Sequence, residues 1–118
     1  MIMKIDAIVR EEKFEDVKNA SMEIEVNGLT VSQVMGCGLQ RGYKEIVRGM
    51  EVEPQMQPKI KFEIVVSSEE WAEKTIEAIK KAAYTGEFGD GKIFSYPVAS
   101  ATKIRTGETG YDAVQCQE

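Results

Sequence analysis

The order in which hydrophobic periods follow one another constrains the fold of this chain more than any other feature. Four short segments have the composition of strands, three of them with alternating apolar and polar residues: 3–10, 29–35, 59–66 and 93–98. Apolar residues recur at three- and four-residue steps over about 11–24 and 69–83, which predicts two amphipathic helices. The resulting order, strand–helix–strand twice over, is typical of the ferredoxin-like α+β fold, a βαββαβ sandwich. We therefore expect an antiparallel four-stranded sheet with both helices on one face.

The face of the sheet that lacks helices needs cover as well. On the third predicted strand, residues that we expect to face the helices alternate with charged residues on the other face: Ile60, Phe62 and Ile64 with Lys59, Lys61 and Glu63. Such a charged face either meets copies of the same chain in an oligomer or lies in solvent. The alternation alone leaves both interpretations open.

Composition excludes several kinds of site. The chain has 118 residues, 42% of them hydrophobic, which suits a single domain over 1–118 that needs no disulfide or metal to fold. It has no histidine, and Cys37 and Cys116 are far apart, so common zinc patterns and histidine-dependent catalytic pairs are missing. A net charge of −5 argues against direct binding to nucleic acid. We find neither a signal-peptide pattern nor an apolar run of roughly 18–20 residues, and we expect a cytoplasmic protein.

Two segments lack a sustained period. The first, about residues 37–57, has glycines at its start, prolines near its end and several charged residues. Loops of about 20 residues are uncommon in small domains, where they are usually functional or disordered. The second segment follows the last predicted strand. We expect it to be irregular and to end in a polar tail over about 112–118.

Two short segments suit phosphate groups. Residues 86–93 fit Gly-x-x-x-x-Gly-Lys, but Ile93 stands where a Walker A loop needs Ser or Thr, and the segment joins a helix to a strand. Its glycines expose backbone N–H groups beside Lys92, so both an anion site and a plain turn remain open. Lys103 and Arg105 lie on one face of a segment that we expect to be extended, about 7 Å apart. That spacing suits neighbouring phosphates, or a charged edge in solvent.

Longer motifs in both halves of the chain resemble those of the PII family of nitrogen-regulatory signalling proteins. Near the C-terminus, TGEFGDGKIF is followed by IRTGE, which resembles the signature of that family. In the first half, four segments occur in the order of the family: 3–8, 28–31, 36–40 and 47–49. The resemblance covers nearly the whole chain. It implies a homotrimer that senses ATP, ADP and 2-oxoglutarate and acts by binding other proteins.

The resemblance also implies a nucleotide site in each of three clefts between subunits. One chain would surround the phosphates with its glycine-rich segment, and the neighbouring chain would contribute two cations from its C-terminal loop. Residues of the sheet would line the base and ribose. The ATP- and ADP-binding set implied in this way is Ile8, Thr30, Gly38, Leu39, Gln40, Glu63, Val65, Gly89, Asp90, Gly91, Lys92, Lys103 and Arg105.

A second ligand, 2-oxoglutarate, is expected to bind beside ATP through Mg²⁺. By resemblance, Gln40 ligates the metal, Lys59 pairs with a carboxylate, and Gly42 contributes backbone to the pocket. A dicarboxylate joins a triphosphate only if cations neutralise the pair, so binding should be synergistic with ATP and should fail with ADP. The base of the long loop belongs to this pocket, which makes the loop a candidate order–disorder switch.

The long loop corresponds to the T-loop, the effector arm of the family. Arg48 matches the arginine that enters the cytoplasmic exit of an ammonium transporter in some members, so we expect reversible association with the membrane through that partner. Glutamine synthetase, a nitrogen-responsive transcription factor and the regulation of nitrogenase are alternative family roles. A slow ATPase using Asp90 or Glu63 as a base, and a trimer that binds partners without ligand control, are also open.

Several positions depart from the pattern of the family. Residues that relatives modify covalently are absent: Val52 and Val47 replace two tyrosines, and Met50 replaces a serine, so uridylylation and phosphorylation are not expected. Leu39 and Lys103 stand where arginine is common. Lysine keeps the charge but lacks the bidentate fork of arginine, which predicts weaker phosphate binding.

Overall fold

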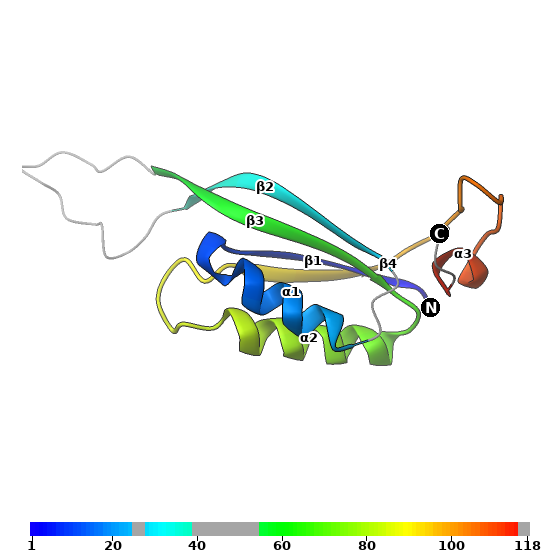
Figure 1. Ribbon diagram of the computed structural model, residues 1–118, viewed down its shortest axis with the longest axis horizontal. Coiled ribbons are helices and arrows are strands. Elements are labelled where there is room, and N and C mark those ends of the chain that lie inside the picture. Colours follow the sequence, from blue (N-terminus) through cyan, green and yellow to red (C-terminus); the bar gives the residue numbers. More distant parts are fainter. Residues whose placement is uncertain (25–27, 39–54, 116–118) are drawn as a thin grey trace, which may run out of the picture.

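Two layers make up the protein, a sheet and a pair of helices that cover one of its faces (Figure 1). The computed structural model describes residues 1–24, 28–38 and 55–115. The elements follow in the order β1 (Met3–Arg10), the short 3₁₀ helix η1 (Glu11–Lys13), α1 (Phe14–Met22), β2 (Leu29–Gly38), β3 (Gln55–Val66), α2 (Glu69–Ala83), β4 (Lys92–Pro97) and α3 (Tyr111–Gln115). None of the helices within these ranges is long and apolar enough to cross a membrane.

The sheet has the strand order β2-β3-β1-β4, and every neighbouring pair is antiparallel. Ala7 in the central strand β1 lies opposite Phe62 of β3 on one side and Ile93 of β4 on the other. The two strands of each βαβ unit are thus separated by one strand of the other unit: β3 lies between β1 and β2, and β1 lies between β3 and β4. This order confirms the predicted ferredoxin-like α+β fold.

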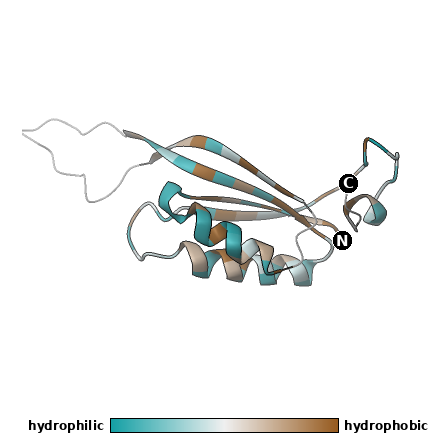
Figure 2. Cartoon of the chain, in the orientation of Figure 1, coloured by the Kyte–Doolittle hydropathy of each residue, from teal (hydrophilic) through white to brown (hydrophobic). Residues whose placement is uncertain are grey.

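The core lies between the sheet and the two long helices, and strand alternation fills it from one side. Residues such as Ile5, Val9 and Phe62 are completely or almost completely buried, and Val17 of α1 and Ile79 of α2 close the layer from above. Apolar and polar bands alternate along β2 and β3 in Figure 2, as strand geometry requires. The prediction that Ile60, Phe62 and Ile64 face the helices is confirmed.

Two element boundaries differ from the sequence prediction near the long loop. Strand β2 continues to Gly38 and β3 begins at Gln55, so the strands extend into the segment expected to be a loop over about 37–57. Residues 39–54 lie outside the described part of the chain. Strand β3 includes Pro58, which a strand with two neighbours would exclude. Because β1 ends at Arg10, opposite Lys59, β3 has β2 as its neighbour at this point and accommodates the proline.

Two helical predictions need smaller corrections. The helix expected over about 11–24 begins with the 3₁₀ turn η1 and ends at Met22. The segment after the last strand was expected to be irregular, but α3 occupies Tyr111–Gln115 within it. Val114 explains this helix: its side chain is 8% exposed, so one apolar residue anchors a segment whose other residues are mainly polar.

Candidate functional site

The turn between α2 and β4, residues 84–91, is the first component of the candidate site and is called the glycine loop below. Gly86, Gly89 and Gly91 all have positive φ angles, of 88°, 100° and 104°. A side chain at Gly91 would be impossible without movement, because its Cβ would lie 1.8 Å from the carbonyl oxygen of Ile8. The glycines therefore let the loop approach the backbone of β1 closely.

Asp90 organises the glycine loop from within. Its Oδ2 accepts hydrogen bonds from the backbone N–H groups of Thr85 and Gly86, both at 2.9 Å. Its Oδ1 accepts from the Thr85 hydroxyl and, at 3.0 Å, from Nε of Arg10. Although partial burial acts in the opposite direction, these donors hold the pKa of Asp90 well below its usual range. Asp90 is therefore an ionised acceptor whose two oxygens are both engaged.

Two cations on neighbouring strands, Arg10 and Lys59, donate hydrogen bonds to the loop. Arg10 also donates from Nη2 to the carbonyl oxygen of Phe88 at 2.6 Å, and Nζ of Lys59 donates to the carbonyl oxygen of Gly89. Arg10 and Lys59 lie directly opposite each other in the β1–β3 pair. Desolvation, and then the charge of Arg10, lower the pKa of Lys59. No local sequence pattern marks Arg10 as a site residue, because its partner Asp90 is 80 positions away.

Lys59 also lies at the entry to the long loop, where the predicted 2-oxoglutarate site would be. Its stem passes so close to β2 that a Cβ at Gly36 would lie 3.2 Å from Lys59 Cγ. Gly38 is the last residue of β2. The other residues assigned to this region by resemblance lie outside the described part of the chain: Leu39, Gln40, Gly42 and Arg48.

The helix-free face of the sheet carries the residues expected to line the base and ribose. Ile8 lies opposite Lys92 of β4, Thr30 opposite Glu63, and Val65 opposite Lys4. Ile8, Glu63 and Val65 alternate with the buried positions of β1 and β3. Thr30 and Lys92 are the direct cross-strand partners of Glu63 and Ile8, so they lie on the same face. The structure thus gathers Ile8, Thr30, Glu63, Val65 and Lys92 on a common surface, and Lys92 directly follows the glycine loop.

A polar network crosses the same face toward its other end. Lys4 Nζ donates to Glu63 at 2.8 Å and lies 3.7 Å from Asp6, whose Oδ2 accepts a 2.7 Å hydrogen bond from Tyr96. The hydrogen bond to Glu63 raises the pKa of Lys4, although desolvation opposes it. Phe94 of β4, half exposed, lies on this face as well. A polar and aromatic face of this kind remains open in the single chain.

The C-terminal segment differs from the prediction. Residues 104–106 form a turn, closed by a 2.8 Å hydrogen bond from Gly107 N–H to the Lys103 carbonyl, and not an extended piece. Lys103 is 5% exposed, with Nζ 3.8 Å from Glu108, whereas Arg105 is exposed. The prediction that both cations share one face of an extended segment is therefore wrong, because the turn directs them differently.

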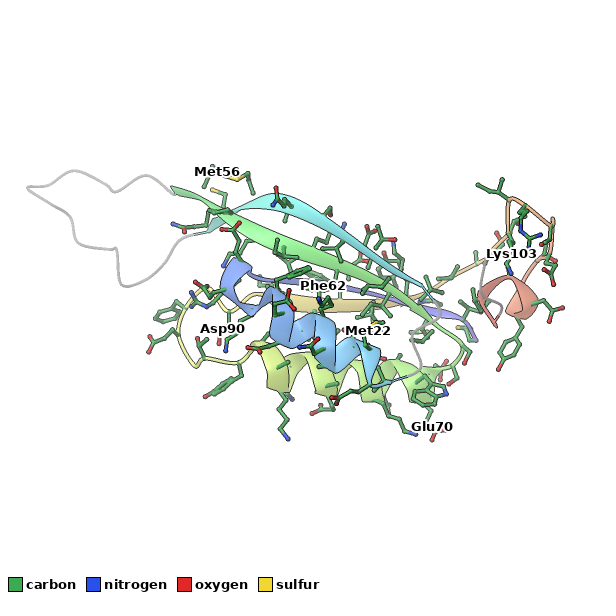
Figure 3. All side chains as sticks on the ribbon, viewed as in Figure 1. Met22, Met56, Phe62, Glu70, Asp90 and Lys103 are labelled. Carbon is green, nitrogen blue, oxygen red and sulfur yellow. The ribbon has the colours of Figure 1, made fainter. Side chains whose placement is uncertain are left out.

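Within one chain, the two phosphate-suited segments do not meet. Figure 3 places Asp90 at one end of the sheet and Lys103 at the other. Among the described residues, no group of three or more His, Cys, Asp or Glu side chains could hold a metal ion. The fold and the site therefore define a ferredoxin-like protein with a candidate anion-binding loop beside an open sheet face.

Comparison with known proteins gives the family. The family model described as Nitrogen regulatory protein P-II matches residues 2–108. Nitrogen regulatory protein P-II 1 of Methanothermobacter thermautotrophicus is 50% identical over 111 residues, which cover 94% of this chain and 96% of that protein. The chain belongs to the nitrogen regulatory protein P-II family of signal transducers.

Solved structures agree with this assignment. The B. subtilis GlnK–ATP complex is 37% identical with a TM-score of 0.76, and the similarity covers 95% of this chain and 96% of that one. Arabidopsis thaliana PII bound to citrate is 38% identical with a TM-score of 0.73, covering 95% of this chain and 91% of that one. One relative therefore holds ATP and another a polycarboxylate.

Proposed function

We propose that this protein senses adenine nucleotides and 2-oxoglutarate as a homotrimer and signals their levels by binding partner proteins in the cytoplasm. The observation that carries the proposal is the separation, within one chain, of Asp90 in the glycine loop from Lys103 in the C-terminal segment (Figure 3). Two segments suited to phosphate at opposite ends of a subunit form one site only between subunits. The open polar face of the sheet supports an oligomer in which other copies cover it.

ATP or ADP would bind between the glycine loop of one subunit and the C-terminal segment of the next. The backbone of Gly89 and Gly91, together with Lys92, would meet the phosphates, and exposed Arg105 would reach them from the neighbour. Asp90 would act through the shape of the loop, since both its oxygens are engaged. The base and ribose would lie against the helix-free face, near Ile8, Thr30, Glu63 and Val65. The ATP-bound relative supports the ligand.

2-Oxoglutarate would bind near Lys59, at the entry to the long loop. Gln40 would ligate Mg²⁺ shared with ATP, and Gly42 would contribute its backbone. The citrate-bound relative supports a polycarboxylate ligand. Lys59 is a donor beside a second cation, Arg10, and two adjacent cations favour a doubly charged anion.

The long loop would carry the signal to an ammonium transporter through Arg48, with reversible association to the membrane. Glutamine synthetase, a nitrogen-responsive transcription factor and the nitrogenase system are the alternative partners. An ATPase based on Asp90 is disfavoured, since a carboxylate with a strongly lowered pKa is a poor proton acceptor.

Light scattering and titration calorimetry test the sensing function. We expect a particle of three times 13.2 kDa that binds ADP and ATP, and that binds 2-oxoglutarate only when ATP and Mg²⁺ are present. A monomer, or a trimer with no measurable affinity for nucleotide, would contradict the proposal.

A pull-down from membranes of the source organism tests the partner. We expect an ammonium transporter to be retained in the presence of ADP and released by ATP, Mg²⁺ and 2-oxoglutarate. Arg48→Ala should abolish its retention, whereas Lys44→Ala, a matched change in the same loop, should not. Retention of glutamine synthetase or a transcription factor instead would replace the transporter by that alternative.

A further inference from the structure

We infer that Arg10 is a positioning residue for the glycine loop, holding residues 88–90 in the conformation that nucleotide binding requires without touching the nucleotide. The inference rests on the proposed function as far as nucleotide is concerned. Its structural part, that Arg10 fixes the loop, rests on contacts within the single chain.

The contacts of Arg10 bracket the centre of the loop. One nitrogen, Nε, donates to the Asp90 carboxylate at 3.0 Å, and another, Nη2, donates to the Phe88 carbonyl at 2.6 Å. Gly89, between these two residues, has a φ angle of 100°. A planar guanidinium makes two such bonds in fixed geometry, which a lysine cannot do. Arg10 therefore fixes the position and the orientation of the peptide groups around Gly89.

Without the glycine loop, the charges at this end of the β1–β3 pair would repel each other. Arg10 and Lys59 lie directly opposite each other on β1 and β3, and like charges in that arrangement destabilise a sheet. Here the loop supplies the compensating groups: Asp90 and the Phe88 carbonyl for Arg10, and the Gly89 carbonyl for Lys59. The strand pair and the loop therefore stabilise each other, and each depends on the other.

Arg10 also compensates a charge that would oppose nucleotide binding. Asp90 is ionised beside the peptide groups proposed to meet phosphate, and an isolated carboxylate there would repel a phosphate anion. The other donors to Asp90 are the neutral groups of Thr85 and Gly86, so Arg10 supplies the positive charge within hydrogen-bonding distance. Removal of Arg10 should thus weaken nucleotide binding through both the loop conformation and its charge.

The test measures ADP affinity by calorimetry and backbone amide exchange of residues 84–92 by mass spectrometry, on the intact protein. In Arg10→Met, ADP should bind about tenfold more weakly or worse, and the amides of Thr85 and Gly86 should exchange faster without ligand. Arg10→Lys should restore part of the ADP affinity and part of the protection from exchange, because lysine keeps the positive charge but lacks the bidentate guanidinium. Glu12→Gln is the matched control: Glu12 lies 4.0 Å from Arg10 and is exposed, so it should change neither measurement.

A double-mutant cycle with Asp90→Asn tests whether Arg10 acts through its ion pair with Asp90. The combined loss in ADP affinity should be smaller than the product of the two single losses, because both changes break one ion pair. Wild-type ADP affinity and wild-type exchange in Arg10→Met would overturn the inference, as would faster exchange with unchanged affinity. If Arg10→Met does not fold, Arg10→Lys decides in the same way. If the wild-type protein does not bind ADP, the proposed function fails, and the exchange of ligand-free Arg10→Met still decides whether Arg10 fixes the loop.

Discussion

The position of Gly91 in the glycine loop tolerates no side chain. A substituted Cβ would lie 1.8 Å from the Ile8 carbonyl oxygen, and the φ angle of 104° is strained for any other residue. The loop runs directly alongside β1 at this point, because Lys92 pairs with Ile8, so it can yield only by moving away from the strand. Gly110 has a positive φ of 64° as well, yet a Cβ there would meet nothing within 4 Å.

The two glycines give a matched pair of substitutions. Gly91→Ala should lower the free energy of unfolding by more than about 2 kcal/mol, since steric overlap adds to backbone strain. Gly110→Ala should cost only the strain, about 1–2 kcal/mol. Urea denaturation of both variants measures the difference. Equal losses would mean that the contact with Ile8 is not a constraint.

Asp90 predicts a pH dependence of stability. Its pKa is lower in the folded protein than in the unfolded chain, so the ionised group stabilises the fold at neutral pH. That contribution should be complete above the unfolded value, about 3.9, and should fade as the pH falls below it. Asp90→Asn should cost about 2 kcal/mol at pH 7, because Asp90 accepts several hydrogen bonds, one of them from Arg10.

The measurement is the free energy of unfolding from urea titrations between pH 7 and pH 3. The difference between the wild-type protein and Asp90→Asn should be constant down to about pH 5 and shrink below about pH 4. Glu87→Gln in the same loop serves as the control, since the side chain of Glu87 is exposed. A difference that grows as the pH falls would contradict the lowered pKa of Asp90.

At the scale of elements, α2 carries the glycine loop at its C-terminal end, and its start is fixed by Ser68. The Ser68 hydroxyl accepts a 3.1 Å hydrogen bond from the Trp71 N–H, and acidic Glu69 and Glu70 follow in the first turn. Among the buried residues of the helix are Ala72 and Ile79, which hold it against the sheet. The sequence predicted this helix correctly, because its hydrophobic period is a local signal.

Loss of the Ser68 cap should lower the stability of the fold modestly and leave the nucleotide site unchanged. Ser68→Ala should lower the free energy of unfolding by about 1 kcal/mol, whereas Ser68→Asp should lose little because aspartate also caps helices. ADP affinity should be unchanged in both, since the cap is at the opposite end of α2 from the loop. Thermal unfolding and calorimetry check this prediction, and a large loss of affinity would show that α2 transmits changes along its length.

At the scale of the whole molecule, the glycine loop and the C-terminal turn lie at opposite ends of the sheet (Figure 1). A site built from both needs two subunits, and this requirement can be tested by mixing variants. Lys92→Met should remove one half of every site, and Arg105→Ala the other half. Each homotrimer should bind ADP much more weakly than wild type.

Trimers assembled from both variants together should recover ADP sites of wild-type affinity. Wherever a subunit with intact Lys92 meets a neighbour with intact Arg105, one complete site forms. Calorimetry after co-refolding or co-expression measures the number of recovered sites. Mixed trimers without any high-affinity site would contradict a site shared between subunits.

The sequence by itself determined the elements and their order. Alternation in β1 and β3, the helical period of α2 and the cap at Ser68 depend on residues close together in the chain, so local patterns predict them. The motifs around residues 85–94 and 104–108 also identified the family before any geometry was known. The ends of β2 and β3, and the helix α3, were predicted less well because pairing and the burial of Val114 decide them.

Only the tertiary structure decided how the candidate site is held. Arg10 and Asp90 are 80 positions apart, and the close approach of Gly91 to Ile8 depends on the pairing of β1 with β4. The turn that buries Lys103 and exposes Arg105 likewise depends on backbone hydrogen bonds, which hydrophobic periodicity does not predict. Local periodicity fixes which segments become strands and helices, whereas contacts between distant segments fix where each charge lies.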